Sequence, residues 1–174
     1  KNEVATAEDV SQMADLVKEG IQAGALGFTT SRTELHTTRE EIAMPGTYAD
    51  EDELLGIGNA IGELGGKGIY GVVSDFNDWE KEMDWMKRLS LQNKCQINFV
   101  LFFREEEDWP RVLKQLAYVR EANAEGARLI PHVGARPVNI LLSWDGTVNP
   151  FSFHSNYAAL SIMSHEERLA ELRK

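Results

Sequence analysis

The chain has 174 residues and a formal net charge of −10, from 28 acidic and 18 basic residues. Apolar residues make up 43% of it and charged residues 26%, which is the balance of an ordinary globular domain with room for a core. The negative charge argues against nucleic-acid binding, because a phosphate backbone selects a basic surface, and no apolar run is long enough to span a bilayer. The partner that we expect is a small molecule, and neither a nucleic acid nor a membrane.

Helical and strand patterns alternate along the chain. Apolar residues recur at helical spacing in four segments and form short runs in four others. In chain order we expect a helix over 7–24, a strand over 25–31, a helix over 50–68, a strand over 69–76, a helix over 78–93, a strand over 95–103, a helix over 107–126 and a strand over 127–135. A long irregular segment follows over 136–160, and then an amphipathic run over 164–174.

Local signals refine the second helix and the third strand. Asp50 precedes the helix, and Glu53 follows three residues later, which is the spacing of a capping box. Three interior glycines weaken this helix individually and predict close packing against a sheet. The run over 95–103 is nearly continuous in apolar residues, which is typical of a strand buried on both faces.

Strands separated by helices predict a parallel sheet with right-handed crossovers, and therefore an α/β fold. Two architectures suit four such units: a doubly wound sheet, or part of a (βα)8 barrel, which needs roughly 250 residues when complete. Either one places functional loops at the carboxyl ends of the strands. We expect a single α/β domain over 1–174.

Cys95 is the only cysteine, which excludes an internal disulfide and a zinc site made of cysteines alone. We interpret it as a partly buried free thiol, and a reducing cytoplasm is the location that fits it. The first residues lack the pattern of a secretory signal. The chain opens on Lys1 and ends inside an amphipathic run, so we expect a fragment of a longer polypeptide.

Polar residues at the expected carboxyl ends of the strands form the candidate site. Asp75 ends the second strand, and we predict a catalytic role for it, because a carboxylate in such a place needs a partner. Ser31, Arg32 and His36 begin a long connection after the first strand, and we predict that they bind substrate. An arginine there suits a substrate carboxylate. The alternative is a structural salt bridge from Arg32 to Asp75 or Glu34.

The fourth strand adds His132, and Arg136 follows it. Because both faces of a parallel strand are buried, the sequence leaves open whether His132 faces a barrel lumen or a helix. We predict His132 as a metal ligand and Arg136 as a substrate-binding residue. No phosphate-binding glycine loop follows a strand, and the chain has no His-x-His pair.

Three stretches carry a family resemblance. They are "GALGFTTSRTELH" with the later "PGTYADEDEL", then "GKGIYGVVSDF", and finally "GARPVNILLSWDGTVNPFSFHSNYAAL". In this order they resemble segments of metal-dependent amidohydrolases related to the N-acyl-D-amino-acid deacylases. The resemblance runs through nearly the whole chain and implies a (βα)8 barrel, of which this chain covers about the fourth to the seventh strand.

The resemblance also implies a metal cofactor, zinc or another divalent ion, which polarises an amide carbonyl and activates water. This sequence departs from the family at two ligand positions. Val73 stands near the place of the fifth-strand histidine, and Leu101 or its apolar neighbours stand near that of the sixth. Asp75 and His132 are the candidates for a rearranged site.

We therefore expect a fragment of a metal-dependent amidohydrolase-like hydrolase that cleaves the C–N amide bond of a small N-acyl amino-acid-like substrate. The separate chain should show little activity. An open half-barrel exposes sheet edges and apolar faces, so we also expect a homo-oligomer. Two alternatives stay open: a non-catalytic binding or scaffold protein derived from the barrel, and a complete doubly wound domain that binds a small ligand.

Overall fold

The computed structural model describes residues 4–38, 42–103, 106–136, 141–144, 146, 149–152 and 154–174. The described residues up to Val133 form one compact unit, and those from Gly134 onward form a second. The α/β arrangement lies in the first unit. That 1–174 folds as a single domain stays a prediction, and each unit is described here by itself.

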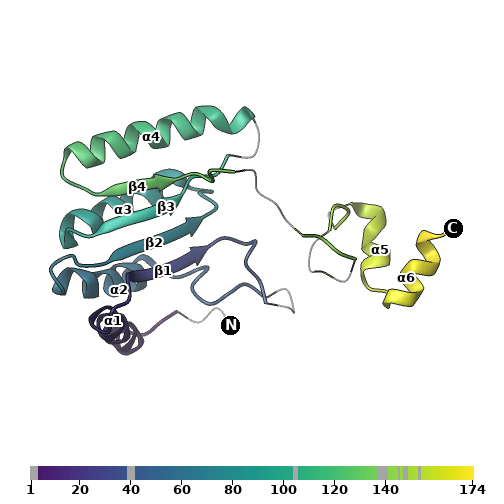
Figure 1. The fold of residues 1–174 in the computed structure, drawn as a ribbon, viewed down its shortest axis with the longest axis horizontal. Coiled ribbons are helices and arrows are strands. Elements are labelled where there is room, and N and C mark those ends of the chain that lie inside the picture. The colour runs from purple at the N-terminus through teal and green to yellow at the C-terminus, as the bar shows by residue number, and fades with distance from the viewer. Residues whose placement is uncertain are drawn as a thin grey trace. The chain divides into compact units, whose positions relative to one another are not determined.

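The first unit contains a four-stranded parallel sheet with the strand order β1-β2-β3-β4 (Figure 1). The strands are β1 Gly27–Arg32, β2 Ile69–Ser74, β3 Gln96–Val100 and β4 Leu129–His132. The helices are α1 Ala7–Gln22, α2 Glu51–Glu63, α3 Trp79–Asn93 and α4 Trp109–Ala124, the last preceded by a 3-10 turn, Glu106–Asp108. The predicted alternation of helices and strands over 7–135 is confirmed.

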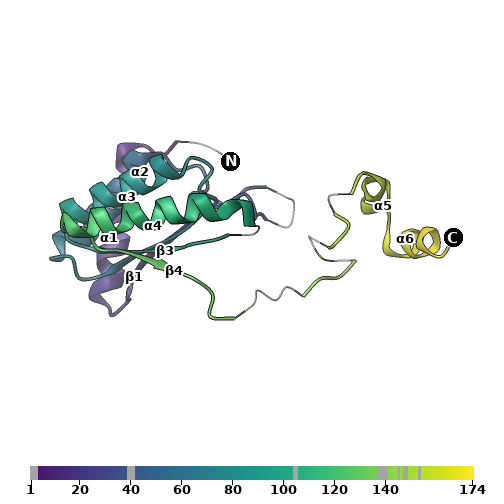
Figure 2. The same cartoon turned by 90° about the horizontal axis from the view of Figure 1, so that it is seen from above.

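The strand order decides between the two predicted architectures. A doubly wound sheet reverses its strand order at a switch point and carries helices on both faces. Here the strands follow one another in sequence order, and α2, α3 and α4 lie on the same side of the sheet (Figure 2). The α/β class is therefore confirmed, and the arrangement is that of part of a (βα)8 barrel.

Burial alternates along the strands because the helices cover one side of the sheet. Tyr70 and Val72 on β2, and Ile97 and Phe99 on β3, are buried against the helices, whereas their neighbours are only half-buried. The expected burial of β3 on both faces is therefore wrong. We call the other side the open face; its residues are Thr29, Ser31, Gly71, Val73, Asn98, Val100, Ile130 and His132.

The glycines of α2 allow close packing against neighbouring helices. A Cβ at Gly56 would lie 2.3 Å from a methyl group of Val10 on α1, and one at Gly58 would lie 2.4 Å from a methyl group of Leu89 on α3. A Cβ at Gly62 would lie 2.1 Å from the Asn93 side chain. The prediction of close packing is correct, but its partners are α1 and α3 and not the sheet.

The start of α2 differs from the predicted capping box. Asp50 occupies the N-cap, but its side chain makes no capping hydrogen bond there. Asp78 does cap α3, where its carboxylate accepts from the Lys81 N–H at 3.2 Å.

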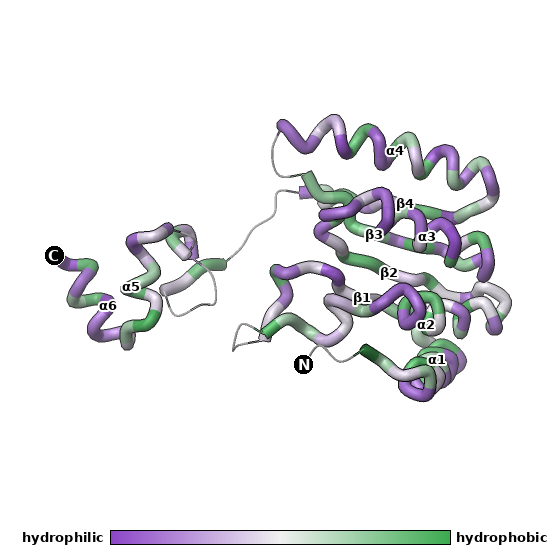
Figure 3. The backbone as a smooth tube through the Cα atoms, turned by 180° about the vertical axis from the view of Figure 1, so that it is seen from behind, coloured by the Kyte–Doolittle hydropathy of each residue, from purple (hydrophilic) through white to green (hydrophobic). Residues whose placement is uncertain are grey.

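Alternating colours along α4 show its polar and apolar residues in turn (Figure 3), as expected for a helix with one side against a sheet.

The second unit contains short helices: the 3-10 turn Ser155–Tyr157, then α5 Ala158–Ser161 and α6 His165–Leu172. The Arg168 guanidinium donates to the carbonyls of Leu160 and Met163 at 3.0 Å each, which ties α6 to the end of α5. Trp144 stacks on Phe151 with ring centroids 5.6 Å apart. Throughout the described parts of both units, no helix has the length and apolar character needed to cross a membrane.

Candidate functional site

The carboxyl ends of the strands bring four side chains into one row on the open face. Ser31 is paired with Val73, and Val100 with His132. The pairing of Val72 with Phe99 makes Val73 and Val100 neighbours as well. The row therefore reads Ser31, Val73, Val100, His132, which settles the direction that the sequence left open: His132 faces the side of the sheet opposite α2, α3 and α4.

A pocket of about 560 Å³ lies over this row. His36, Ser31 and His132 all line it, together with Asn98 and apolar or small residues. None of its described lining residues is acidic or carries a fixed positive charge. We call it the open-face pocket. It joins three of the predicted site residues, since Ser31 and His36 come from the first strand and its connection, and His132 comes from the fourth strand.

Ser31 and His36 form a direct pair at the pocket wall. The Ser31 Oγ lies 2.5 Å from the His36 Nδ1, so one of the two donates a proton to the other according to the tautomer of the ring. When the serine donates, the Nε2–H of His36 remains available as a donor toward a ligand. His132 is held in place by its backbone, whose carbonyl accepts from the Leu101 N–H at 2.8 Å.

Arg32 points away from the open-face pocket, because it follows Ser31 along the strand and side chains alternate. Its Nε donates to both carboxylate oxygens of Glu82, at 3.1 and 3.0 Å, and its Nη2 donates to Oε1 at 3.0 Å. Its Nη1 donates to the Ala49 carbonyl at 2.8 Å. Ser74 adds a hydrogen bond to Glu82 at 3.1 Å. The geometry is that of the structural alternative, a partly buried salt bridge.

The partner of Arg32 is the residue that the sequence analysis missed. The candidates Asp75 and Glu34 were wrong, and Glu82 takes that place from α3. A signal for it was present: Glu82 lies three residues before Trp85 and four before Met86, on the buried side of the helix. A carboxylate in a buried helical stripe calls for a cationic partner.

Asp75 anchors the connection that follows β1. Its carboxylate accepts from the Thr33 hydroxyl at 2.7 Å and from the Glu34 N–H at 2.8 Å. It lines a different cleft, of about 460 Å³, in which Arg111 also takes part. The structure therefore does not place Asp75 in the open-face pocket with His132. A catalytic role for Asp75 stays a prediction, and the contacts that it makes are structural ones.

The connection from β1 to α2 is fastened at both ends. Asp75 holds its start, and Arg32 holds Ala49 near its end. Between them Thr37 and Ala43 form an antiparallel bridge, and the Met44 N–H donates to the His36 carbonyl at 3.2 Å. This fastening keeps His36 beside Ser31 at the pocket. It explains why the stretch is so rich in polar and turn residues.

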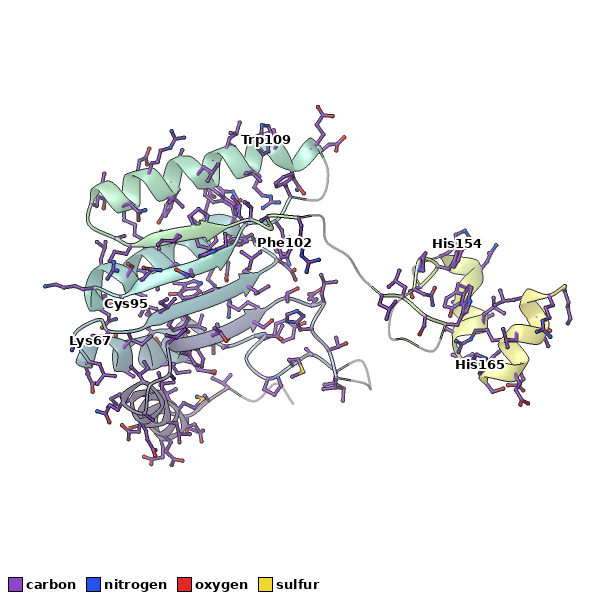
Figure 4. All side chains as sticks on the ribbon, in the orientation of Figure 1. Lys67, Cys95, Phe102, Trp109, His154 and His165 are labelled. Carbon is purple, nitrogen blue, oxygen red and sulfur yellow. The ribbon has the colours of Figure 1, made fainter. Side chains whose placement is uncertain are left out.

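Two further predicted features can be placed. Arg136 is exposed and belongs to the second unit, and its role in substrate binding stays a prediction. Cys95 is buried at the start of β3, at the opposite end of the sheet from Phe102 (Figure 4). Burial raises the pKa of its thiol to about 11, which agrees with an inert free cysteine.

A metal centre does not fit the described residues. Zinc sites use three or four His, Cys, Asp or Glu ligands. Across the described part of the chain, no three such side chains lie together in a way that would hold an ion. Val73 and Val100 separate Ser31 from His132 in the row, and valine offers no ligand atom. No chemical step is therefore derived through a metal.

The chain resembles several solved structures. It matches no protein-family model and no curated protein. An N-acyl-D-glutamate deacylase from Bordetella bronchiseptica, solved with zinc and a phosphonate mimic of the tetrahedral intermediate, matches with a TM-score of 0.60 at 18% identity, over 78% of this chain and 27% of that one. A D-aminoacylase with a binuclear metal centre matches with a TM-score of 0.60 at 16% identity, over 75% of this chain and 26% of that one.

A further D-aminoacylase structure, described as defining a novel subset of amidohydrolases, gives a TM-score of 0.58 at 15% identity, over 75% of this chain and 26% of that one. These likenesses establish the fold: the chain folds like part of a D-aminoacylase-type amidohydrolase. The resemblance drawn from the sequence motifs is confirmed at that level. The chain spans about a quarter of the length of these structures.

Proposed function

We propose that this chain forms the substrate-binding part of a metal-dependent amidohydrolase-like hydrolase, which cleaves the C–N amide bond of a small N-acyl amino-acid-like substrate. The observation that carries the proposal is the open-face pocket. It offers two histidines, a serine and an asparagine, without an acidic residue among its described lining, in a chain whose net charge is −10. Such a pocket offers hydrogen-bond donors to an anionic ligand and places no acidic side chain of its described lining against it.

The donors can be assigned to parts of such a substrate. The Ser31–His36 pair presents a donor to the carboxylate of the amino-acid part. His132 and Asn98 line the same pocket and offer donors to the acyl carbonyl. Val73 and Val100 give an apolar floor for the acyl chain. The fold shared with the N-acyl-D-glutamate deacylase supports this class of substrate.

Titration of the purified chain with N-acetyl-D-glutamate, followed by calorimetry and by NMR of the histidine rings, tests the proposal. We expect saturable binding that shifts the His36 signals, and weaker binding by the variants Ser31→Ala and His36→Gln. The same compound with its carboxylates converted to amides is the matched control, and it should not bind. Absence of binding, or equal binding of the amide, contradicts the assignment.

A second candidate function is a barrel-derived protein that binds the same kind of ligand without cleaving it. The observation that favours it is the pair Val73 and Val100, which stand between Ser31 and His132 in the row of the open face and offer no ligand atom. Amine release from N-acetyl-D-glutamate, measured with and without added Zn²⁺, separates the two. Turnover that depends on Zn²⁺ supports the hydrolase and contradicts the second candidate, whereas binding without turnover agrees with both, because the separate chain is expected to show little activity.

A further inference from the structure

The Ser31–His36 pair has the geometry of a nucleophile and its base. The Ser31 Oγ and the His36 Nδ1 lie 2.5 Å apart, so a proton can pass directly between them. A serine hydroxyl is a weak nucleophile by itself, and a neighbouring imidazole activates it by taking its proton. The pair therefore contains the two groups that a covalent attack on a carbonyl carbon needs, in addition to a donor for binding.

The hydroxyl of Ser31 serves no contact that holds the fold together. Among the described residues, its only hydrogen-bond partner is the ring of His36. The buried Ser74 differs, because its hydroxyl donates to the Glu82 carboxylate at 3.1 Å and accepts from the Phe76 N–H at 3.1 Å. The Ser31 oxygen is therefore available to a ligand, whereas that of Ser74 is used by the structure.

The backbone holds His36 in place on both sides. The His36 N–H donates to the Thr33 carbonyl at 3.3 Å, and the His36 carbonyl accepts from the Met44 N–H at 3.2 Å. Thr33 is itself fixed, since its hydroxyl donates to the Asp75 carboxylate at 2.7 Å. With the backbone fixed, only the side-chain torsions of His36 have to be ordered for its contact with Ser31. The pair is therefore arranged before a ligand arrives, which is what efficient attack requires.

The open-face pocket gives a small acyl group a place beside Ser31. Val73 pairs with Ser31 on the next strand, and Val100 follows it in the row, so the two valines provide an apolar surface. The described lining holds no acidic residue and no fixed positive charge. An uncharged compound with a short apolar acyl chain suits this lining. An ester suits the pair better than an amide, because an alcohol leaves the attacked carbon more readily than an amine does.

We propose that Ser31 and His36 are the catalytic pair of an esterase activity that needs no metal and acts on small uncharged carboxylic esters. This activity goes beyond the proposed amide hydrolysis and does not depend on it. The contact that carries the proposal joins two residues five positions apart, at the end of β1 and in the connection that follows it, so it lies wholly within this chain.

The reaction has two steps, and the same nitrogen carries the proton in both. The Ser31 Oγ attacks the acyl carbon of the ester while its proton passes to the His36 Nδ1. The C–O bond to the alcohol then breaks, the departing oxygen takes that proton, and the acyl group remains on Ser31 as an ester. In the second step water attacks this ester and gives a proton to Nδ1. The carboxylic acid is released as the Ser31 oxygen regains the proton.

A fluorophosphonate probe, which reacts covalently with activated serines, tests the pair on the unaltered chain. Peptide mapping by mass spectrometry should place the label on Ser31, and unfolding in urea should abolish the labelling. Ser31→Ala should take up no label. His36→Gln should react more slowly by about a hundredfold or more, which is the range for loss of a general base. Ser11→Ala is the matched control, because Ser11 is exposed on α1 and its loss should change nothing.

Hydrolysis of phenyl acetate in the presence of EDTA is the second readout. We expect turnover by the natural chain and by Ser11→Ala, and none above background by Ser31→Ala, with circular dichroism confirming that each variant is folded. Absence of label, a label on another residue, labelling without turnover, or turnover that EDTA abolishes would each overturn the proposal. Failure of the chain to bind N-acetyl-D-glutamate would contradict the proposed function and leave this test unaffected.

Discussion

Replacing Glu82 by glutamine tests whether Arg32 is a structural residue or a substrate residue. The substitution leaves the guanidinium of Arg32 without its counter-charge, in a site where the two side chains are only 17% and 12% exposed. Removing one partner of a buried ion pair costs about 3–5 kcal/mol, and the residual exposure places the expected loss near the lower figure, about 3 kcal/mol. Since a domain is stable by about 5–15 kcal/mol, such a loss is large.

Urea unfolding followed by tryptophan fluorescence measures this loss. The double variant Arg32→Met with Glu82→Met removes both charges and should lie within about 1–2 kcal/mol of the natural chain, because no unpaired charge remains. Arg88→Met is the control: Arg88 bonds Glu51 and Asp84 while 39% exposed, so its loss should cost less than about 1 kcal/mol. A small loss in Glu82→Gln, with ligand binding abolished in Arg32→Met, would refute the structural role.

Two further predictions concern the core. Burial raises the pKa of the Cys95 thiol to about 11, so the thiol should stay protonated and react slowly with a thiol reagent at about pH 8. Its labelling should become fast when urea unfolds the chain. Equal labelling rates in the folded and the unfolded chain would contradict its burial. Gly58→Ala should lower the free energy of unfolding by about 1–3 kcal/mol, because the new methyl group meets the Leu89 side chain. Gly20→Ala has nothing within 4 Å of the new methyl group, so it should stabilise α1 by about 0.5–1 kcal/mol. Thermal unfolding compares the two variants.

The candidate site shows which residues sequence reasoning could bring together. It selected Ser31, His36 and His132 because polar residues followed predicted strands, and the structure brings these three to one pocket. The rule is sound because parallel strands carry all their carboxyl ends to one edge of the sheet. Arg32 and Asp75 occupy equivalent places in the sequence, but their side chains bind Glu82 and the start of the connection at Thr33 and Glu34, and their roles toward a substrate stay predictions.

The different placement of these neighbouring side chains has a definite cause. Ser31 and Arg32 are adjacent, and which of them faces a ligand depends on which side of the sheet the helices cover. The periodicity of a strand shows only that the two side chains point to opposite faces of the sheet. In an antiparallel sheet with one solvated face, polarity would decide between them, but parallel sheets are commonly covered on both faces, so polarity does not tell the two faces apart. The same ambiguity made β3 look buried on both faces.

The sequence by itself determined the alternation of helices and strands, the parallel α/β class and the family likeness, because these depend on local periodicity and on short motifs that survive in order along the chain. Only the tertiary structure decided the sequential strand order, the face on which His132 lies and the pairing of Arg32 with Glu82. Those features depend on contacts between residues far apart in the chain. The local pattern of apolar and polar residues does not specify such contacts, because many different long-range partners are compatible with the same pattern.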